Sequence, residues 1–472
     1  MKTQFKEISG SIIAPKGFQA AGVFCDIKRL GTGKGSQKGK KRDLALIVSE
    51  TPATVAGMFT TNQVCAAPVK VCVERMKKGT ARAIVVNSGN ANACTGKQGM
   101  ADAREMVDFT ERALNLPKGS VLVGSTGRIG VTMPMDNVRA GIVEAGVYLG
   151  STIEHAAHTV EAIMTSDTKP KEIAVEFKLG GKTVRIGGIC KGAGMIQPGM
   201  SVTGARPAAL PHGGLHATML GFITTDVAID AKSLQAALQE ATAQSFNRIT
   251  VDGDMSTNDT VLVLANGMAG NTPLVAADVR RLIPKSKAVR ASSRRLLRDL
   301  EIFQAALNHV CLELAKKIVR DGEGVHRVVT VRVNGAKTVQ DADAVARAVA
   351  NSALVKTSWH GGDPNWGRII DAIGYSAAKV VEEKVDIGYS SASASDASAR
   401  RGGKKILWSL KRGQPTKATF KELCTAAAPK EFELHINLNL GKASAVMYAA
   451  DLTEAYVDYN KGDVTNPTML GG

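Results

Sequence analysis

The stretch ATMLGFITTDVAI at residues 217–229 decides how the chain is organised. It is a short apolar run, and such runs bounded by turn residues are typical of buried strands. A loop rich in Gly, Pro and Ala, residues 191–216, leads directly into it. Long loops inside compact domains are uncommon and often carry function. The pattern therefore predicts a buried strand that begins at a functional loop.

Strands and helices alternate on both sides of this stretch, which is typical of an α/β protein. Strands are predicted at 43–49, 81–89, 121–127, 260–267 and 325–335. Helices are predicted at 101–116, 136–149, 152–164, 231–249, 293–321 and 342–354. A β-hairpin with a Gly-Gly turn is predicted at 171–190. The chain after about residue 380 has mainly β character.

Length and composition are those of an ordinary globular enzyme. The chain has 472 residues, of which 44% are hydrophobic and 22% charged. No apolar run reaches the ~18–20 residues of a transmembrane helix, and the first ten residues lack the apolar core of a secretory signal. The seven cysteines form no C-x-x-C pair, so neither a disulfide framework nor a Cys-rich zinc site is indicated. We expect a cytoplasmic protein with no membrane partner.

The net charge of +17 is concentrated in three basic tracts, at 28–42, 280–298 and 399–413. A nucleic-acid-binding protein would also be basic. Aromatic residues make up only 4% of the chain, and the tracts lack the interleaved Tyr and Phe on which bases stack. We interpret the tracts as solvated loops and helix faces, and expect no nucleic-acid partner.

Several segments combine tight turns with hydroxyl and charged groups. They are GSTG (124–127), TSDTKPK (165–171), KGAGMIQPG (191–199), ATMLGFITTD (217–226), VDGDMSTNDT (251–260) and RDGEG (320–324). The third lacks the residue order of a phosphate-binding loop. The fifth lacks the final Glu of an EF-hand, so a structural or orienting role is favoured there and no metal site is assigned.

Together these segments resemble one family, the ornithine acetyltransferases, also called glutamate N-acetyltransferases, of arginine biosynthesis. The similarity continues through 14–23, 44–62, 83–96, 355–376 and 451–460, so it covers nearly the whole chain. It implies an α/β fold, a layered α/β sandwich with two sheets between helices of the ornithine acetyltransferase/aminopeptidase-like kind. A smaller C-terminal α+β part is expected from about residue 340.

The resemblance implies self-cleavage at an Ala-Thr bond, here Ala217-Thr218. An α chain, 1–217, and a β chain, 218–472, would result, and Thr218 would become an N-terminal nucleophile. A Thr hydroxyl needs a nearby base to react. The freed α-amino group, with a pKa of roughly 7.7–8, can accept the hydroxyl proton near neutral pH.

Other roles carry over by position. Thr126 and Gly127 correspond to the oxyanion hole. Residues that correspond to the substrate-binding set are Thr165, Lys191, Thr218, Glu323, Asn460 and Thr465. Each position also has an ordinary alternative: a strand-ending turn, an exposed loop lysine, a helix-end carboxylate or a disordered tail.

The implied reaction is ping-pong. N-acetylornithine gives its acetyl group to Thr218, and glutamate then accepts it. No cofactor is expected, and no motif decides whether acetyl-CoA serves as a co-substrate. The α and β chains of one precursor would pair again into a heterotetramer.

Two departures from the family pattern stand out: an insert at 201–216, immediately before the cleavage bond, and extra residues at 466–472. Both flanking motifs of the insert are intact, which favours a surface excursion over a block to cleavage. Two rival functions remain. One is another enzyme with an N-terminal nucleophile, such as an aminopeptidase or amidase. The other is a basic nucleic-acid-binding protein on the same scaffold.

Overall fold

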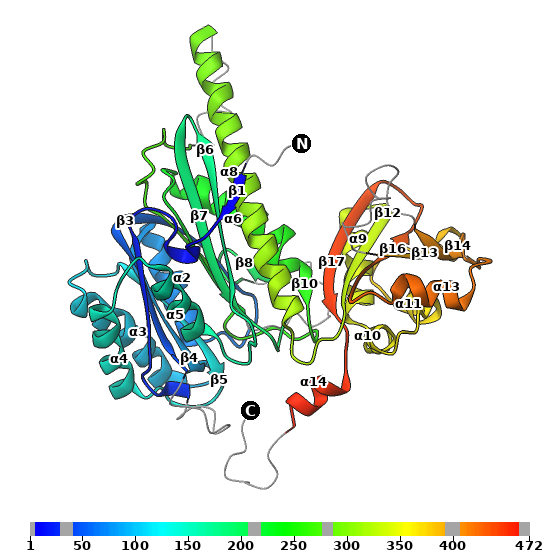
Figure 1. Ribbon diagram of the computed structural model, residues 1–472, viewed down its shortest axis with the longest axis horizontal. Helices are drawn as coiled ribbons and strands as arrows, with labels where there is room; N and C mark the ends of the chain where they lie inside the picture. Colours follow the sequence, from blue (N-terminus) through cyan, green and yellow to red (C-terminus); the bar gives the residue numbers. More distant parts are fainter. Residues whose placement is uncertain (1–4, 29–40, 206–218, 276–286, 392–405, 462–472) are drawn as a thin grey trace.

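The computed structural model describes residues 5–28, 41–205, 219–275, 287–391 and 406–461. Within these ranges the chain forms two lobes, each built around one mixed sheet (Figure 1). The larger lobe has a ten-stranded sheet and the smaller one a seven-stranded sheet. This confirms the predicted α/β class with two sheets. Among the described residues, no helix is both long and apolar enough to cross a membrane.

The large sheet places the stretch that follows the predicted cleavage bond at its centre. Its main order is β1 (Phe5–Ile8), β6 (Lys171–Leu179), β7 (Lys182–Lys191), β9 (Leu220–Thr225), β11 (Thr260–Ala265), β3 (Leu44–Thr60), β4 (Thr80–Asn90) and β5 (Val121–Arg128). Two further strands, β2 (Phe18–Val23) and β8 (Met200–Ser201), pair with β3. All six residues of β9 are buried, as predicted for this stretch.

Helices cover both faces of this sheet. One layer consists of α2 (Ala67–Arg75), α3 (Gly96–Ala113), α4 (Met135–Val147) and α5 (Ile153–Ile163). The other consists of α6 (Ala231–Gln244) and the long α8 (Lys287–Arg320). Side chains of β9 alternate between the two cores, since Phe222 belongs to the core shared with the first helix layer, where it lies beside Gly124 of β5, and Ile223 belongs to the core of the second. Burial on both faces explains why β9 has an almost continuous apolar sequence.

The smaller lobe is the predicted C-terminal α+β part. Its sheet has the order β10 (Ile249–Thr250), β17 (Ala443–Ala450), β12 (Val328–Ala336), β16 (Glu431–Asn437), β13 (Asp386–Ser391), β14 (Leu407–Lys411) and β15 (Gln414–Pro415). Its helices are α9 (Val339–Asn351), α10 (Ala353–His360), α11 (Trp366–Gly374) and α13 (Phe420–Ala427), and α14 (Glu454–Tyr459) follows the last strand. Short 3₁₀ turns lie at Ser11–Ile13, Met76–Lys78, Phe246–Arg248 and Glu382–Lys384.

Two local features test the sequence rules. The turn of the predicted hairpin has positive φ at both Gly180 (56°) and Gly181 (87°), as a two-residue turn between twisted strands requires. By contrast, β3 is much longer than the strand predicted at 43–49, because it continues past Pro52. Its pairing with β4 shifts register between Val48 and Ala53, and this irregularity accommodates a residue that has no N–H to donate.

Lys356 provides a stability prediction for the smaller lobe. It is buried in α10, and its ammonium donates a hydrogen bond to the carbonyl oxygen of Ala450 at the end of β17. Burial lowers the pKa of Lys356 from 10.5 to about 8. Between these values the unfolded chain binds more protons than the folded one, so the free energy of unfolding should rise with pH in this window.

Replacement of the titrating group tests this sign. In Lys356→Met, the rise between about pH 8 and 10 should be smaller than in the wild type, by up to about 1.4 kcal/mol per pH unit. Urea unfolding at several pH values measures the difference, and Lys70→Met, which removes an exposed lysine on α2, is the control. If the free energy of unfolding rises equally with pH in the wild type and in Lys356→Met, the lowered pKa of Lys356 is contradicted.

Candidate active site

The predicted site residues converge at one end of the large sheet. Thr126 lies at the C-terminal end of β5, and Lys191 is the last residue of β7. Because β7 and β9 are antiparallel, Lys191 lies opposite Leu220, at the N-terminal end of β9. Leu220 in turn pairs with Thr260 at the start of β11. The sheet thus brings together the end of β7 and the starts of β9 and β11, which are far apart in the sequence.

Lys191 and Thr126 are in direct contact. The Lys191 ammonium donates a hydrogen bond of 3.2 Å to the Thr126 hydroxyl oxygen, and both side chains are buried. Burial lowers the pKa of Lys191, and the nearby carboxylate of Asp167 counteracts part of this effect. Since Lys191 only donates, the Thr126 hydroxyl keeps its own proton available for another acceptor.

Gly127 lies where β5 and β4 approach most closely. Its φ is 131°, and a Cβ at this position would be 2.3 Å from the carbonyl carbon of Gly89. No side chain fits there. The β4–β5 ladder also becomes irregular at Gly89 and Asn90, and irregularities of this kind often re-aim groups beside active sites. The backbone at Gly127 therefore has a conformation that only glycine allows.

Asp167 connects Thr165 to the segment of Lys191. The Thr165 N–H donates to Asp167 Oδ2 at 2.9 Å, and the Gly192 N–H donates to Oδ1 at 2.7 Å. The buried Lys171 ammonium donates to the same Oδ1 at 2.6 Å. Burial alone would raise the pKa of Asp167, but the charges of Lys191 and Lys171 outweigh burial and hold this pKa well below its usual range. Asp167 is therefore a carboxylate.

Glu323 and Asn460 meet at the same turn. Asn460 Nδ2 donates to Glu323 Oε2 at 3.1 Å. The backbone of Glu323 donates to the carbonyl oxygen of Ala193 at 2.8 Å, two residues after Lys191. A Cβ on Gly194 would lie 2.4 Å from the Glu323 carboxyl carbon, so glycine is needed for this approach. The structure thus unites residues from α8, β7 and the end of α14.

Three predicted site residues, Ala217, Thr218 and Thr465, lie outside the described residues, as do residues 206–216 of the insert. The first described residue after the predicted cleavage bond is Met219. It is buried, and its N–H donates to Asp259 Oδ1 at 2.6 Å. This contact fixes the beginning of β9 at the end of the sheet that carries Thr126 and Lys191.

Asp259 and Asn258 were not among the predicted site residues. Burial raises the pKa of Asp259 well above its usual value, and among the described residues its Oδ2 has no hydrogen-bond partner. The Asn258 amide donates to the carbonyl oxygens of Ala91 (2.6 Å) and Ser125 (2.9 Å), which fixes the end of β5. The only signal in the sequence was the acidic turn 251–260 that contains both.

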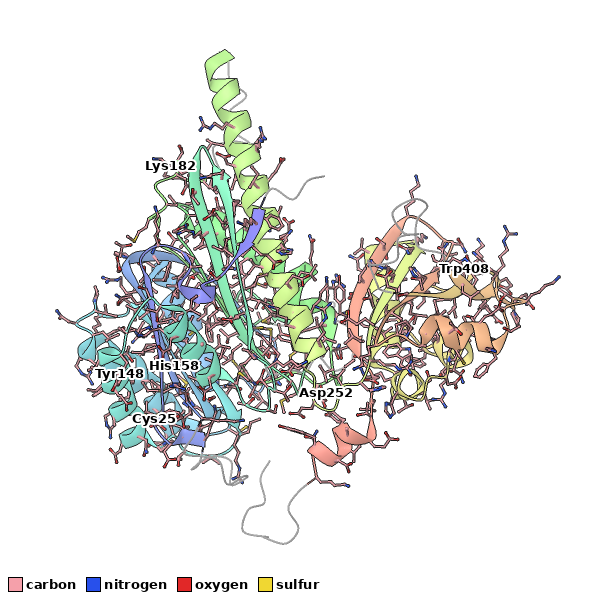
Figure 2. All side chains as sticks on the ribbon, in the orientation of Figure 1. Cys25, Tyr148, His158, Lys182, Asp252 and Trp408 are labelled. Atoms are coloured by element: carbon pink, nitrogen blue, oxygen red, sulfur yellow. The ribbon has the colours of Figure 1, made fainter. Side chains whose placement is uncertain are left out.

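The same turn contains Asp252, at the junction of the two lobes (Figure 2). Its carboxylate accepts hydrogen bonds from the N–H groups of Met195 and Ile196 and from the Tyr456 hydroxyl. Asp252 therefore holds the turn after Lys191 against α14. This agrees with the orienting role that the sequence favoured for the acidic turn.

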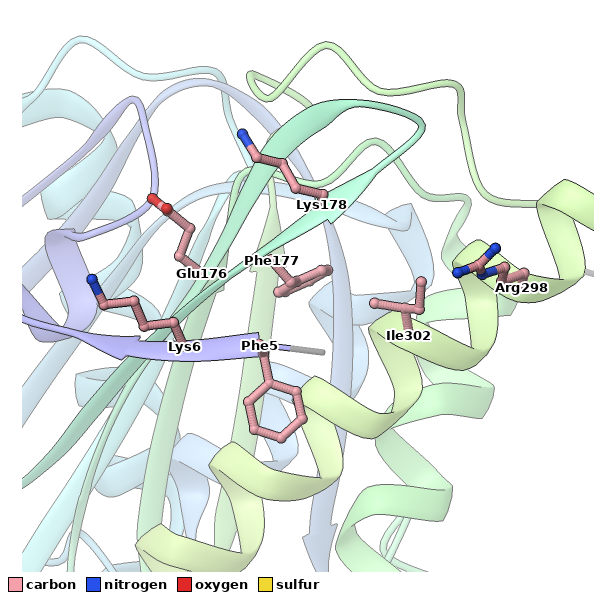
Figure 3. A pocket seen from close by; sticks show the side chains of 7 residues that line it. All are labelled: Phe5, Lys6, Glu176, Phe177, Lys178, Arg298 and Ile302. Atoms are coloured by element: carbon pink, nitrogen blue, oxygen red, sulfur yellow. The ribbon is translucent and has the colours of Figure 1, made fainter. Parts of the chain in front are cut away.

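A separate surface hollow lies far from this site. It is lined by Phe5, Lys6, Glu176, Phe177, Lys178, Arg298 and Ile302 (Figure 3). Ile302 lies near the middle of α8, about 27 Å from the last helical residue, Arg320, along a helix that rises 1.5 Å per residue. Glu323 follows Arg320 closely, so the hollow is not part of the candidate site.

The candidate site offers a buried hydroxyl, a constrained glycine backbone, a buried ammonium and a carboxylate held by an amide. A hydroxyl and a backbone N–H can stabilise an oxyanion. The ammonium and the carboxylate can bind the opposite charges of an amino acid. The arrangement is suited to acyl transfer between amino acids.

Comparison with known proteins agrees with this chemistry. The model of the ArgJ family matches residues 20–463. The arginine biosynthesis bifunctional protein ArgJ of Symbiobacterium thermophilum is 44% identical over 96% of this chain and 98% of its own. The glutamate N-acetyltransferase of Methanocaldococcus jannaschii is 42% identical with the same coverage. The solved ornithine acetyltransferase of Mycobacterium tuberculosis, complexed with ornithine, is 36% identical over 42% of this chain and 100% of that one, with a TM-score of 0.38. The chain therefore belongs to the ArgJ family.

Proposed function

We propose that this chain transfers the acetyl group of N-acetylornithine to glutamate through an acetyl ester on Thr218. The main support is its 42% identity, over 96% of its length, to a protein named glutamate N-acetyltransferase. The Lys191–Thr126 contact adds a local argument, since it brings the Thr126 hydroxyl, which can donate a hydrogen bond, to the end of the sheet where β9 begins.

The nucleophile is first freed by cleavage of the Ala217-Thr218 bond. Hydrolysis of this amide leaves a carboxylate on Ala217 and an amine on Thr218. The amine is the base that the Thr218 hydroxyl needs. Met219, held by Asp259 at 2.6 Å, anchors the chain directly after this residue.

Acetyl transfer then takes place in two half-reactions. The Thr218 Oγ attacks the acetyl carbonyl, its proton passes to the α-amine, and the oxyanion accepts hydrogen bonds from the Thr126 hydroxyl and the Gly127 N–H. The C–N bond breaks, and ornithine leaves with the proton. The glutamate amine next attacks the ester and regenerates the Thr218 hydroxyl.

Charged side chains select the substrates. Lys191 pairs with the substrate carboxylate, and Glu323 pairs with the free ammonium of the ornithine side chain. Thr165, Asn460 and Thr465 complete the binding set. Opposite charges in a buried site interact strongly because little solvent screens them.

The proposal extends to assembly and location. The α and β chains remain together and pair into a heterotetramer in the cytoplasm. Acetyl-CoA is a second acetyl donor for glutamate, and a reaction without N-acetylornithine separates this activity from the exchange.

Mass spectrometry of an exchange reaction tests the proposed function. With N-acetylornithine and glutamate, ornithine and N-acetylglutamate should form in equal amounts. An aminopeptidase or amidase would use water as the acceptor. Release of acetate that far exceeds the formation of N-acetylglutamate would therefore favour that rival.

Replacement of the nucleophile tests the self-cleavage. Thr218→Ala removes the hydroxyl, so we expect one full-length chain and no exchange activity. Intact mass under denaturing conditions should give two fragments for the wild type, one that ends at Ala217 and one that begins at Thr218. Thr218→Ser, which keeps a hydroxyl, is the matched control and should retain cleavage. Normal exchange by Thr218→Ala would exclude the mechanism.

The oxyanion role of Thr126 has its own test. Thr126→Ala should lower kcat on the order of 10–1,000-fold, because one donor to the oxyanion is lost. Thr126→Ser keeps the donor and should stay near the wild-type rate. The exchange assay measures both variants, and an unchanged kcat in Thr126→Ala would remove this residue from the oxyanion hole.

A further inference from the structure

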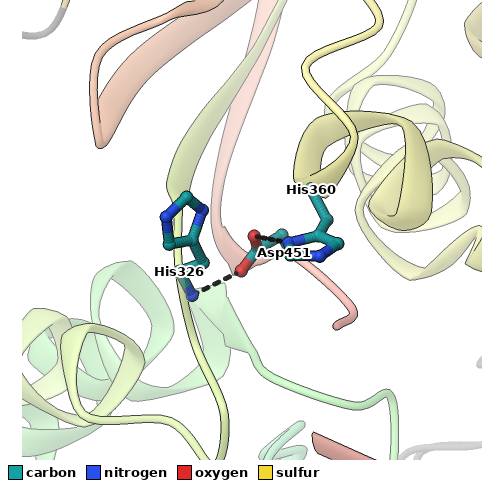
Figure 4. A group of neighbouring side chains, drawn as sticks. All are labelled: His326, His360 and Asp451. Carbon is teal, nitrogen blue, oxygen red and sulfur yellow. Dashed lines mark hydrogen bonds and ion pairs between the residues drawn. The ribbon is translucent and has the colours of Figure 1, made fainter. Parts of the chain in front are cut away.

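Two histidines and an aspartate meet beside the candidate active site, near the N-terminal end of α14. His326 precedes β12, His360 ends α10, and Asp451 follows β17 (Figure 4). One potential ligand atom from each residue lies within 4.8 Å of the others. Asp451 is 3% exposed, His360 is half-buried and His326 is exposed. The cluster is therefore buried on the side of Asp451 and open to solvent on the side of His326.

Two polar atoms on the buried side of the cluster face each other without a hydrogen bond. His360 Nδ1 and Asp451 Oδ2 are 3.5 Å apart. Both atoms are buried, and neither has a hydrogen-bond partner among the described residues. Buried polar atoms in native proteins are almost always satisfied, so each exception requires an explanation.

The second ring nitrogen of His360 has a carboxylate partner. Its other ring nitrogen, Nε2, is 2.6 Å from Glu454 Oε2. If Nε2 carries the proton and donates it to Glu454, Nδ1 has a lone pair directed at the Asp451 carboxylate. Two lone pairs that face each other in a buried site need a positive charge between them.

Asp451 is positioned by its other oxygen. Oδ1 accepts the backbone N–H groups of His326 and Arg327, both at 2.9 Å. These bonds fix the carboxylate and leave Oδ2 free. Glu454 fixes His360 in the same way from the opposite side of the ring. In metal sites, the histidine ring nitrogen that does not bind the metal usually donates to a carboxylate or a similar acceptor. This partner sets the tautomer and the orientation of the ring.

We propose that His326, His360 and Asp451 bind a divalent transition metal ion, with zinc as the best match. Two imidazoles and one carboxylate form a common zinc ligand set that keeps a fourth position for water. Imidazole nitrogen favours zinc and its neighbours over magnesium and calcium, which prefer oxygen. The two carboxylates, Asp451 and Glu454, balance the charge of a divalent ion.

The distances fit a site that closes around its ion. Tetrahedral zinc with bonds of about 2.0–2.2 Å separates its ligand atoms by roughly 3.3–3.5 Å. His360 and Asp451 already have this separation, at 3.5 Å. The remaining adjustment falls to His326, whose exposed ring forms an edge-to-face pair with His360 at 5.7 Å between centroids. The movement required is small, because the three ligand atoms already lie within 4.8 Å of one another.

The position of the ion defines its role. His326 and Glu323 belong to the same short connection between α8 and β12. Asp451 leads into α14, whose Thr453 hydroxyl donates to the Gly324 carbonyl oxygen at 2.7 Å. At the far end of α14, Asn460 contacts Glu323. A bound ion would therefore join the connection that carries Glu323 to the segment that carries Asn460, as a brace and not as a catalyst.

Calorimetric titration of the tag-free, chelator-treated full-length protein with zinc chloride tests the site. The wild type should bind one zinc ion per chain at this site. Glu454→Gln changes only the carboxylate that contacts His360 Nε2, so it should weaken zinc binding about 10–100-fold. His326→Ala removes a proposed ligand and should weaken zinc binding further. His309→Ala is the matched control, because His309 pairs with Glu7 at 3.0 Å but belongs to no three-ligand group in the described part of the chain.

A second readout does not depend on calorimetry. Zinc should raise the melting temperature of the wild type and of His309→Ala, and leave His326→Ala unchanged, because only a bound ion stabilises the folded state. Since His326 is exposed, its replacement should not prevent folding. Absence of stoichiometric zinc in the wild type would mean that a proton holds His360 between Asp451 and Glu454, and would overturn the proposal. Equal zinc affinity in the wild type and His326→Ala would overturn it as well.

Discussion

One buried lysine holds the candidate site together. The Lys171 ammonium, with a side chain only 1% exposed, donates to the carboxylates of both Asp167 and Asp321. Removal of one partner from such a network leaves an unpaired buried charge, which is far more costly than loss of a surface ion pair. Asp321 follows α8, and Asp167 accepts the Gly192 N–H beside Lys191. Lys171 therefore links the end of α8, the end of β7 and the loop after α5, and the N–H groups of Thr168 and Lys169 add to this link because they also donate to Asp321.

Two aspartates near this network have opposite pKa shifts. Asp167 lies between two ammonium groups, whose charges hold its pKa well below the usual range. Asp259 is also buried, but there burial outweighs the hydrogen bond from the Met219 N–H and the charge of Lys191, so its pKa is raised well above the usual value. The same residue type is thus pushed toward the ionised form in one place and toward the neutral form in the other. Environment, and not residue identity, decides which role each aspartate has.

The sequence predicted the fold best where the pattern was local. The 81–89 and 121–127 strands and the Gly-Gly hairpin are all present, because alternation and turn residues act over a few positions. The full length of β3 was missed, since Pro52 indicates an end unless the partner strand provides a register shift. Lys171 was predicted only as the last residue of the segment 165–171 and received no role: a lysine at the start of a strand is normally exposed, and only tertiary structure places two carboxylates around it.

The candidate site was predicted from a resemblance and not from the residues alone. Thr126 and Lys191 are 65 positions apart, and their contact depends on strand order, which local patterns do not encode. Asp259 was not assigned a role because its significance comes from the N–H of Met219, which precedes the neighbouring parallel strand. The basic tracts, which contribute much of the net charge, include many residues outside the described ranges, and none of the contacts at the site involves them.

The strand order of the large sheet has a consequence for the cut protein. Strands β9 and β11, from the second half of the chain, lie between β7 and β3, from the first half. Neither half contains the complete large sheet, because the first half would be split into two separate pieces and the β9–β11 pair of the second would have two unpaired edges. Cleavage before β9 would therefore create two polypeptides that share one core and fold as a single cooperative unit. Separation of the pair would require unfolding, so the break releases a chain end without releasing a subunit.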